Sequence, residues 1–305
     1  MPIFSRPHLP CLAMLVLMSP AMAEPAYRQS LDDAWWTGPL LANSAATLGQ
    51  EHVLVESYLY DEIKSHSDGA ASLSYFLYGV TDRFTVGLIP VAGYNRVDNA
   101  PSGAGLGDTT VQFQYGLFAF DSERGIPAIS VTLQETLPTG RYDRLGTTLA
   151  NGLGGGAFTT NLAILSQHYF WLPNGRLLRA RLNVGHAFST SADVQDASVY
   201  GTATGFHGQA QPGNALSANL SLEYSVTRRA VLALDFQLHH NDATRVDGFA
   251  GSSFNSGSSD AFALAPALEY SWTPNIGVLV GARVIFKGHN TQASITPAIA
   301  INYVH

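Results

Sequence analysis

Cysteine occurs only once in the 305 residues, as Cys11 in a short apolar stretch near the start of the chain. Residues 1–23 combine a positive charge, Arg6, with that stretch and with the small residues Ala-Met-Ala at 21–23. This is the three-part pattern of a secretory signal peptide, so we expect cleavage before Glu24. The mature chain would then contain no thiol, which excludes disulfides, zinc–thiolate sites and cysteine nucleophiles.

Long hydrophobic runs are also missing. The apolar stretch within residues 1–23 is about half as long as the roughly 20 residues that a membrane helix requires, and Pro20 ends it. No other run of about 18 apolar residues exists, so the sequence predicts no transmembrane helix. The mean hydropathy of +0.07 is too low for a helical membrane protein, but it suits a membrane β-barrel, which has only one apolar face.

Charged residues are scarce as well, at 13% of the chain. The formal net charge is −7, and this surplus of negative charge argues against nucleic acid as a partner. Glycine, by contrast, is frequent, with 29 residues. Gly-rich stretches such as GAGLG (103–107), GLGGG (152–156) and GSSFNSGSS (251–259) predict mobile or tightly turned loops rather than separate domains.

Alternation of polar and apolar residues is the main pattern that the sequence does contain. In DTTVQFQYGLFAF (108–120) the polar and small residues take every second position, which predicts a β-strand with one polar and one apolar face. Twelve segments alternate in this way: 51–60, 72–79, 83–94, 108–120, 126–137, 158–171, 176–188, 215–226, 229–240, 261–272, 276–286 and 292–304.

The connections between these segments alternate in length. Short connections are expected at 80–82, 121–125, 172–175, 227–228 and 273–275. Long connections are expected at 61–71, 95–107, 138–157, 189–214 and 241–260, with a shorter last one at 287–291. Outer-membrane barrels place short turns on the periplasmic side and longer loops outside, whereas a soluble sandwich has no reason to sort its loops. An even number of strands also brings both ends of a barrel to the periplasmic side.

Alternation alone does not decide where the apolar faces point, because a soluble sandwich would bury them and a barrel would turn them to lipid. The loop lengths and the expected signal peptide favour the barrel. The predicted lipid-facing residues are then Val111, Phe113, Tyr115, Leu117, Leu178, Leu182, Leu232, Leu234 and Phe236. The predicted lumen-lining residues are Glu56, Asp108, Thr110, Gln112, Gln114, Gln134, Arg179, Arg181, Asn183, Glu223, Asp235, Gln237, Glu269 and Arg283.

Aromatic residues gather near the ends of the predicted strands, where the aromatic girdles of membrane barrels lie. This set comprises Tyr58, Tyr60, Tyr75, Tyr94, Tyr169, Trp171, Tyr270, Trp272 and Tyr303. Residues 24–50 precede the first strand and contain Trp35 and Trp36. We expect this segment to contact the barrel, at the periplasmic rim or as a partial plug, because both rings would otherwise be exposed.

Catalytic and metal-binding patterns are weak throughout. GAGLG (103–107) is followed by a predicted strand and not by the helix that a dinucleotide fingerprint needs. His239 and His240 are adjacent in a strand and therefore point to opposite faces, which argues against a shared metal site. No GxSxG motif is present. We therefore name no catalytic residue, no metal ligand and no cofactor.

Charged residues on the polar faces leave two interpretations open. Arg179 and Arg181 share one face of a strand, about 7 Å apart by the strand rise, and Glu223, Asp235 and Glu269 point the same way on later strands. They could form an internal salt-bridge ladder that stiffens the barrel. They could also form a charged constriction that selects solutes, as rings of charge do in pores. The two roles are compatible.

Several short stretches carry a resemblance to a known family. They are WTGPLLANSAATLGQEHVLVESYLYD (36–61), GDTTVQFQYGL (107–117), LPTGRYDRL (137–145), LPNGRLLRARLN (172–183), SVYGTATGF (198–206), EYSVT (223–227) and LALDF (232–236). In order and number they resemble the outer-membrane proteins grouped as the MetA-pathway of phenol degradation family. The resemblance implies an outer-membrane β-barrel of transporter type, and some members are encoded near pathways for aromatic compounds. The family has no established catalytic residues to carry over.

One feature departs from outer-membrane barrels, which usually finish on an aromatic residue that the insertion machinery uses. This chain finishes on His305, with Tyr303 two residues earlier. The sequence thus predicts a signal peptide (1–23), an N-terminal segment (24–50) and an all-β, up-and-down antiparallel barrel of about 12 strands (51–305) in the bacterial outer membrane. The expected function is passive passage of small molecules, aromatic or hydrophobic compounds among them. The expected partners are outer-membrane lipids, the barrel-insertion machinery and small solutes. A lipid-modifying outer-membrane enzyme and a soluble periplasmic β-sandwich are the alternatives.

Overall fold

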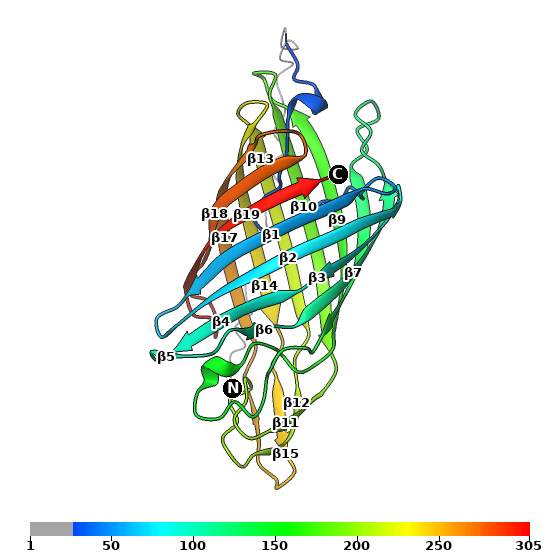
Figure 1. Ribbon diagram of the computed structural model, residues 1–305. Helices are drawn as coiled ribbons and strands as arrows, with labels where there is room; N and C mark the ends of the chain where they lie inside the picture. Colours follow the sequence, from blue (N-terminus) through cyan, green and yellow to red (C-terminus); the bar gives the residue numbers. More distant parts are fainter. Residues whose placement is uncertain (1–26) are drawn as a thin grey trace, which may run out of the picture.

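The computed structural model describes residues 27–305, so the expected signal peptide at 1–23 lies outside the described residues. The chain forms one large antiparallel sheet that closes on itself, because β1 (Val53–Ile63) pairs with β2 (Ser67–Thr81) on one side and with the last strand, β19 (Ser294–Val304), on the other. Figure 1 shows the resulting barrel with its steeply tilted strands. A sheet closed in this way has no free edge, so the alternative of a two-sheet sandwich is wrong.

The wall is built from twelve spans, and each overlaps one of the predicted segments. One span is interrupted at Pro90, which has no N–H for the ladder and separates β3 (Phe84–Ile89) from β4 (Val91–Val97). After β1, β2 and this span, the order around the barrel is β7 (Thr109–Phe118), β8 (Ala128–Leu137), β9 (Thr159–Trp171), β10 (Leu177–Ser189), β13 (Ala215–Ser225), β14 (Ala230–Asn241), β17 (Ser259–Ser271), β18 (Ile276–Ile285) and β19.

The two ends of the barrel differ in their connections. At one end, which we call the turn end, short connections such as 172–176, 226–229 and 272–275 join the strands, and the chain finishes there. The opposite end, the loop end, carries the long connections. Two of these, 190–214 and 242–258, pair with each other in a small sheet, which consists of β11 (Ala192–Gln195), β12 (His207–Gln211), β15 (Arg245–Gly248) and β16 (Ser253–Asn255).

The other short elements are β5 (Ala100–Pro101) and β6 (Gly105–Leu106), which pair with β4, and the 3-10 turns η1 (Leu31–Asp33) and η2 (Leu149–Asn151). Within residues 27–305, no helix is both long enough and apolar enough to cross a membrane.

The first loop-end connection is shorter than predicted. Residues 61–71 were expected to form a loop, but β1 and β2 stay paired from Tyr60↔Ala71 to Ile63↔Asp68 and leave only 64–66 as a turn. The side chains of this part follow no polar–apolar alternation, since Gly69, Ala70 and Ala71 supply no contrast between the faces. The backbone hydrogen-bond ladder continues regardless, because it does not depend on side-chain identity.

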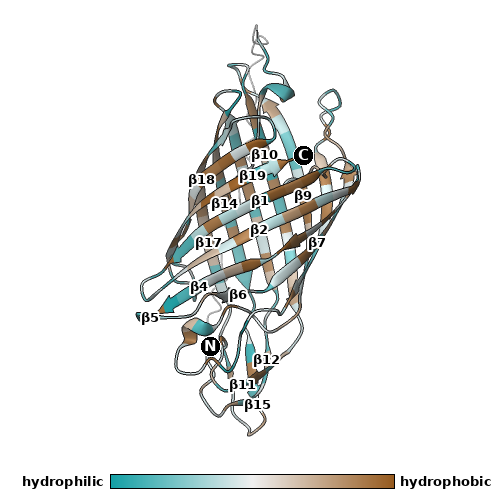
Figure 2. Cartoon of the chain, in the orientation of Figure 1, coloured by the Kyte–Doolittle hydropathy of each residue, from teal (hydrophilic) through white to brown (hydrophobic). Residues whose placement is uncertain are grey.

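Polarity is reversed relative to a soluble protein. Large apolar side chains on the outside of the wall, such as Phe113, Leu182 and Leu232, are exposed, while Gln112, Gln114 and Arg181 are buried inside. Figure 2 shows brown, apolar residues interspersed with pale and teal ones along the strands of the barrel. The structure therefore requires an apolar surrounding for its outer face and confines polar groups to the interior.

Candidate functional site

A stretch of the N-terminal segment, which we call the lumen strap (residues 37–48), runs through the interior of the barrel near the turn end. At its start, Oε2 of Glu269 accepts hydrogen bonds from the backbone N–H groups of Thr37 (2.8 Å) and Gly38 (2.9 Å) and from the Thr37 hydroxyl (3.2 Å). Glu269 is fully buried, two residues before β17 ends. A buried carboxylate is costly unless it is hydrogen-bonded, so these donors stabilise it where it is.

Asp235 on β14 holds the middle of the strap in the same way. Its Oδ2 accepts from the N–H groups of Leu40 (3.0 Å) and Leu41 (3.3 Å), and its Oδ1 accepts from Ala42 (3.2 Å). Three successive backbone N–H groups therefore converge on one carboxylate. Two of the carboxylates that alternation places in the lumen, Glu269 and Asp235, are thus bound by the chain's own N-terminal segment.

Three charged residues on the neighbouring strands β10 and β13 form one buried cluster. Glu223 on β13 is fully buried and accepts two hydrogen bonds from each of two guanidinium groups on β10, Arg179 and Arg181. Arg181 also donates to the carbonyl oxygen of Ala42 in the strap (2.9 Å), and the Arg179 guanidinium lies over the ring of Trp36, 4.3 Å from its centroid. The cluster therefore joins neighbouring strands of the wall and clamps the strap to it.

The second half of the strap crosses further inward-facing polar residues. Asn183 donates to the carbonyl oxygen of Asn43 (3.2 Å), Gln114 donates to that of Ser44 (2.9 Å), and Thr85 accepts from the N–H of Leu48 (3.0 Å). The strap thus follows the inner wall from β17 through β14 and β10 to β7 and β3. It covers the polar half of the lumen.

The segment before the strap lies at the rim of the turn end. The Gln29 side chain is hydrogen-bonded to two neighbouring strands. It donates to Ser225 on β13 (2.9 Å) and accepts from the N–H of Leu177 on β10 (3.2 Å). The Arg228 guanidinium lies over the ring of Trp35, 4.6 Å from its centroid. Both tryptophans of this segment, Trp35 and Trp36, are therefore half-buried against arginines of the barrel.

The structure places the other residues that alternation assigned to the lumen as follows. Gln134 donates to Gln112 (2.7 Å), and Thr110 is hydrogen-bonded to Thr136 (2.8 Å), so the polar side chains of this part of the wall bond to one another across neighbouring strands. Gln237 faces inward on β14 between Asp235 and His239. Two further residues face inward on the side that the strap leaves open: Glu56 and Arg283.

Asp108 differs from the others, because it lies at the loop end and not along the wall. Its Oδ1 accepts from the N–H of Gly140 (2.8 Å) and its Oδ2 from the N–H of Gly155 (2.7 Å). Both donors belong to the connection between β8 and β9, so Asp108 fastens that loop across the outer mouth.

The residues that alternation assigned to lipid lie on the outer face of the wall. Phe113, Tyr115, Leu117, Leu182 and Leu232 are exposed, and Leu232 has the largest exposed fraction of these at 53%. The four others are half-buried by their neighbours in the sheet, namely Val111, Leu178, Leu234 and Phe236.

The prediction of an aromatic girdle is wrong for part of the set. Tyr94, Tyr270, Trp272 and Tyr303 are exposed on the outer face, as a girdle requires. Tyr58, Tyr60 and Tyr75, however, face the interior and line cavities there. Tyr169 also points inward, with its ring 6.1 Å from that of Trp36. The reason is that every second residue of a strand points to the same face. Tyr58 and Tyr60 stand two and four residues after Glu56 and therefore share its inward face.

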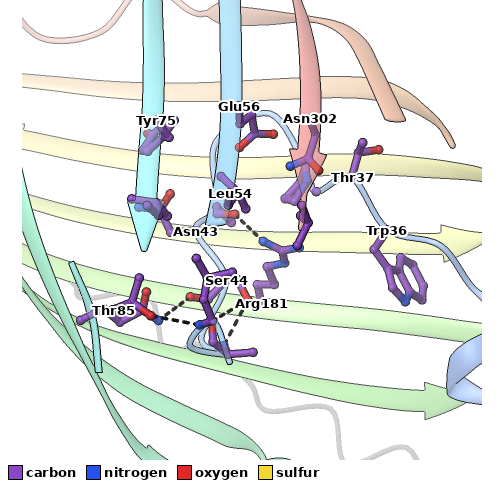
Figure 3. Close-up of a pocket in the computed structure, with 18 of the residues that line it drawn as sticks. Trp36, Thr37, Asn43, Ser44, Leu54, Glu56, Tyr75, Thr85, Arg181 and Asn302 are labelled. Carbon is purple, nitrogen blue, oxygen red and sulfur yellow. Dashed lines mark hydrogen bonds between the residues drawn. The ribbon is translucent and has the colours of Figure 1, made fainter. Parts of the chain in front are cut away.

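Tyr58, Tyr60 and Tyr75 belong to the half of the lumen that the strap leaves uncovered. Between the strap and strands β1, β2 and β19 lies a cavity of about 250 Å³, the inner cavity, lined by Glu56, Tyr75 and Asn302 among others. Figure 3 shows the strap residues Thr37, Asn43 and Ser44 around this cavity together with Glu56, Tyr75 and Asn302 of the barrel wall.

Two more cavities continue towards the loop end. A cavity of about 270 Å³, the tyrosine chamber, shares Leu40, Leu41, Tyr58 and Tyr75 with the inner cavity. A third of about 450 Å³, the outer vestibule, shares Tyr60 with the tyrosine chamber and reaches Asp108 and the loop it holds. The three cavities adjoin along the inner faces of β1 and β2.

The histidines singled out in the sequence do not meet in one site. His239 is hydrogen-bonded to Asn241 (2.9 Å), whereas His240 pairs with Asp260 (2.7 Å) on the other face of the strand. Among residues 27–305 no group of three or more His, Cys, Asp and Glu side chains is placed to hold a metal ion.

The fold matches solved structures of outer-membrane proteins. An outer membrane channel from Pseudomonas putida F1 superposes with a TM-score of 0.65 at 14% identity, covering 87% of this chain and 100% of that one. The NanC porin and the KdgM porin match at TM-scores of 0.46 and 0.43, each at 10% identity, covering 82% and 81% of this chain and 98% of theirs. At these identities the likeness concerns the fold, and only the first match is close enough to support that comparison.

A search of curated proteins finds no match. The model of one protein family, described as "Putative MetA-pathway of phenol degradation", matches residues 38–298. That range includes most of the lumen strap and nearly all of the closed barrel of outer-membrane type. Because the match covers most of the sequence, the chain belongs to this family.

Proposed function

We propose that the protein is a passive outer-membrane channel for small molecules, including aromatic or hydrophobic compounds. The observation that carries the proposal is the row of three adjoining cavities along β1 and β2, which extends from the outer vestibule to the strap. In an outer-membrane barrel the loop end faces outward and the turn end faces the periplasm. Solutes would therefore pass downhill from the vestibule, past the tyrosines, and around the strap.

The strap sets the width of this route. It lies on the polar half of the wall, where Glu269, Asp235 and Arg181 hold its backbone. What remains open is bordered by tyrosines and leucines, with Glu56 and Asn302 as polar groups. Such a lining suits small, poorly water-soluble molecules better than large hydrophilic ones, because the polar groups that would replace a hydration shell are already used by the strap.

Reconstitution tests the proposal. The mature protein is inserted into liposomes, and single-channel conductance in KCl and the flux of small neutral solutes are measured. We expect a small conductance and measurable flux of small aromatic alcohols. Empty liposomes and liposomes with boiled, unfolded protein are the controls. A folded, inserted barrel with neither conductance nor flux would overturn the proposal.

A lipid-modifying enzyme is the other function that the sequence left open. Such an enzyme needs a serine, a histidine and an orienting group close together at the outer leaflet. Among the hydrogen bonds of residues 27–305, none joins a serine hydroxyl to a histidine, and so no arrangement in the described chain favours this function. Incubation of the reconstituted protein with a phospholipid panel measures it directly, and release of fatty acid would contradict the channel as the sole activity.

A further inference from the structure

The tyrosine chamber has an apolar lining with one cation at its outer side. Its walls consist of the rings of Tyr58, Tyr60 and Tyr75 and the side chains of Leu40 and Leu41, and the guanidinium group of Arg283 on β18 faces into it. The aromatic rings come from the barrel and the leucines from the strap. A cavity of about 270 Å³ is at the lower limit of small-molecule pockets, which measure roughly 300–1,000 Å³, so its occupant would be a single-ring compound.

Arg283 is only loosely paired. Its Nη2 lies 3.6 Å from Oε1 of Glu62, which is beyond hydrogen-bonding distance, and the side chain is 29% exposed. The other oxygen of Glu62 accepts from Nζ of Lys64 at 2.8 Å. Two cations thus share one carboxylate, and Arg283 is the one charged residue among those that line the chamber.

A second polar group next to Arg283 lacks a partner. Thr296 lines the chamber, and Arg283 and Thr296 are register partners on β18 and β19. The Oγ1 atom of Thr296 is buried and has no hydrogen-bond partner in the described chain. A buried hydroxyl in this state is unfavourable unless a ligand or water completes its hydrogen bonds.

We propose that the tyrosine chamber is a binding site for small aromatic carboxylates, with the carboxylate held by Arg283 and Thr296 and the ring packed among Tyr58, Tyr60 and Tyr75. A guanidinium group binds a planar carboxylate through two parallel hydrogen bonds. Aromatic rings pack favourably edge-to-face or offset with one another, which selects a flat ring over a saturated one. The proposal rests on the proposed channel, because it places a selective site along that route.

Binding is measured as the block of single-channel KCl current by benzoate, and independently by calorimetry on the folded protein in detergent. The comparison compounds are benzyl alcohol, which keeps the ring, and cyclohexanecarboxylate, which keeps the charge. We expect the wild type to bind benzoate more tightly than either. The variant Arg283→Gln should lose benzoate affinity by about tenfold or more, the range for a hydrogen bond to a charged group. Arg283→Lys should retain part of it.

Tyr60→Leu tests the aromatic part separately. It should weaken benzoate binding while leaving cyclohexanecarboxylate binding nearly unchanged, because only the ring-to-ring contact is lost. Arg245→Gln is the matched control, since Arg245 lies in the small sheet at the loop end and pairs there with Asp247. All variants are first checked for folding by heat-modifiable gel mobility.

The outcomes separate the two proposals. Normal KCl conductance with equal affinity for benzoate and benzyl alcohol, or with unchanged benzoate affinity in Arg283→Gln, would overturn the binding site and leave the channel intact. If the folded protein shows neither conductance nor flux, the channel is wrong. If calorimetry then still shows benzoate binding, and this binding is lost in Arg283→Gln, the binding site is supported without the channel.

Discussion

The backbone N–H of Leu40 lies 3.0 Å from Oδ2 of Asp235, a residue 195 positions later in the chain. Leu41 and Ala42 donate to the same carboxylate. A side chain that alternation assigns to the water-filled interior therefore binds the protein's own N-terminal segment. The strap is therefore held in the lumen by contacts with the barrel wall.

Removal of the Asp235 carboxylate should loosen the strap. In Asp235→Ala three strap N–H groups lose their acceptor, and we expect the strap to be held less tightly by about 3 kcal/mol, since a buried donor left unsatisfied costs roughly 1–3 kcal/mol. Single-channel recordings should show higher or more variable conductance. Gln237→Ala is the control, because Gln237 faces inward on the same strand and makes no hydrogen bond to the strap. Identical recordings for the two variants would contradict the role assigned to Asp235.

Gly277 on β18 leaves just enough room for the strap. A Cβ atom placed there would lie 2.3 Å from Cγ2 of Thr37, so Gly277→Ala should displace the start of the strap and cost about 1–3 kcal/mol, as overpacking usually does. The double variant Gly277→Ala/Thr37→Ser removes Cγ2 but keeps the hydroxyl that donates to Glu269. It should recover most of the loss in urea stability, and a double variant as unstable as the single one would show that the clash lies elsewhere.

Glu223 should be the charged residue on which the barrel's stability depends most. Glu223→Gln leaves Arg179 and Arg181 buried without the carboxylate that each contacts twice. Breaking a buried ion pair in this way typically costs about 3–5 kcal/mol. The measurement is the urea concentration at which heat-modifiable gel mobility is lost. Glu123→Gln, an exposed residue in a turn-end connection, should leave this midpoint unchanged.

Asp108 should control the loop between β8 and β9. Asp108→Ala removes both acceptors for the N–H groups of Gly140 and Gly155, and the loop should open about tenfold or more often, given the strength of hydrogen bonds to charged groups. Trypsin added to intact cells should then cleave faster after Arg141 and Arg144. Asp98→Asn, at the exposed turn of another loop, is the control. Equal cleavage rates in both variants would rule out the fastening role.

Export gives a prediction for the start of the chain. We propose that residues 1–23 are removed as a signal peptide, so mass spectrometry of the protein from outer membranes should find Glu24 as the first residue. Ala23→Pro should block the cleavage and leave the precursor mass. A mature protein that retains residues 1–23 would contradict the proposal, and it would also leave Cys11 in the final chain.

The sequence by itself determined the strands and their two faces. Polar–apolar alternation is a local property of an extended backbone, so it placed Phe113 outside and Gln112 and Gln114 inside without knowledge of the neighbours. The alternation of short and long connections determined the up-and-down order. The sequence also shows that Tyr58 and Tyr60 share the strand face of Glu56, but their position near a strand end favoured the wrong interpretation as a girdle.

Only the tertiary structure decided what the inward residues do. Asp235 and Glu269 have the same periodicity as Glu56 and Arg283, yet the first two bind the lumen strap and the last two line open cavities. This division depends on the route of a segment without regular secondary structure, and no periodic pattern encodes that route. Contacts between residues 37 to 232 positions apart fix it, and closure of the barrel brings them together.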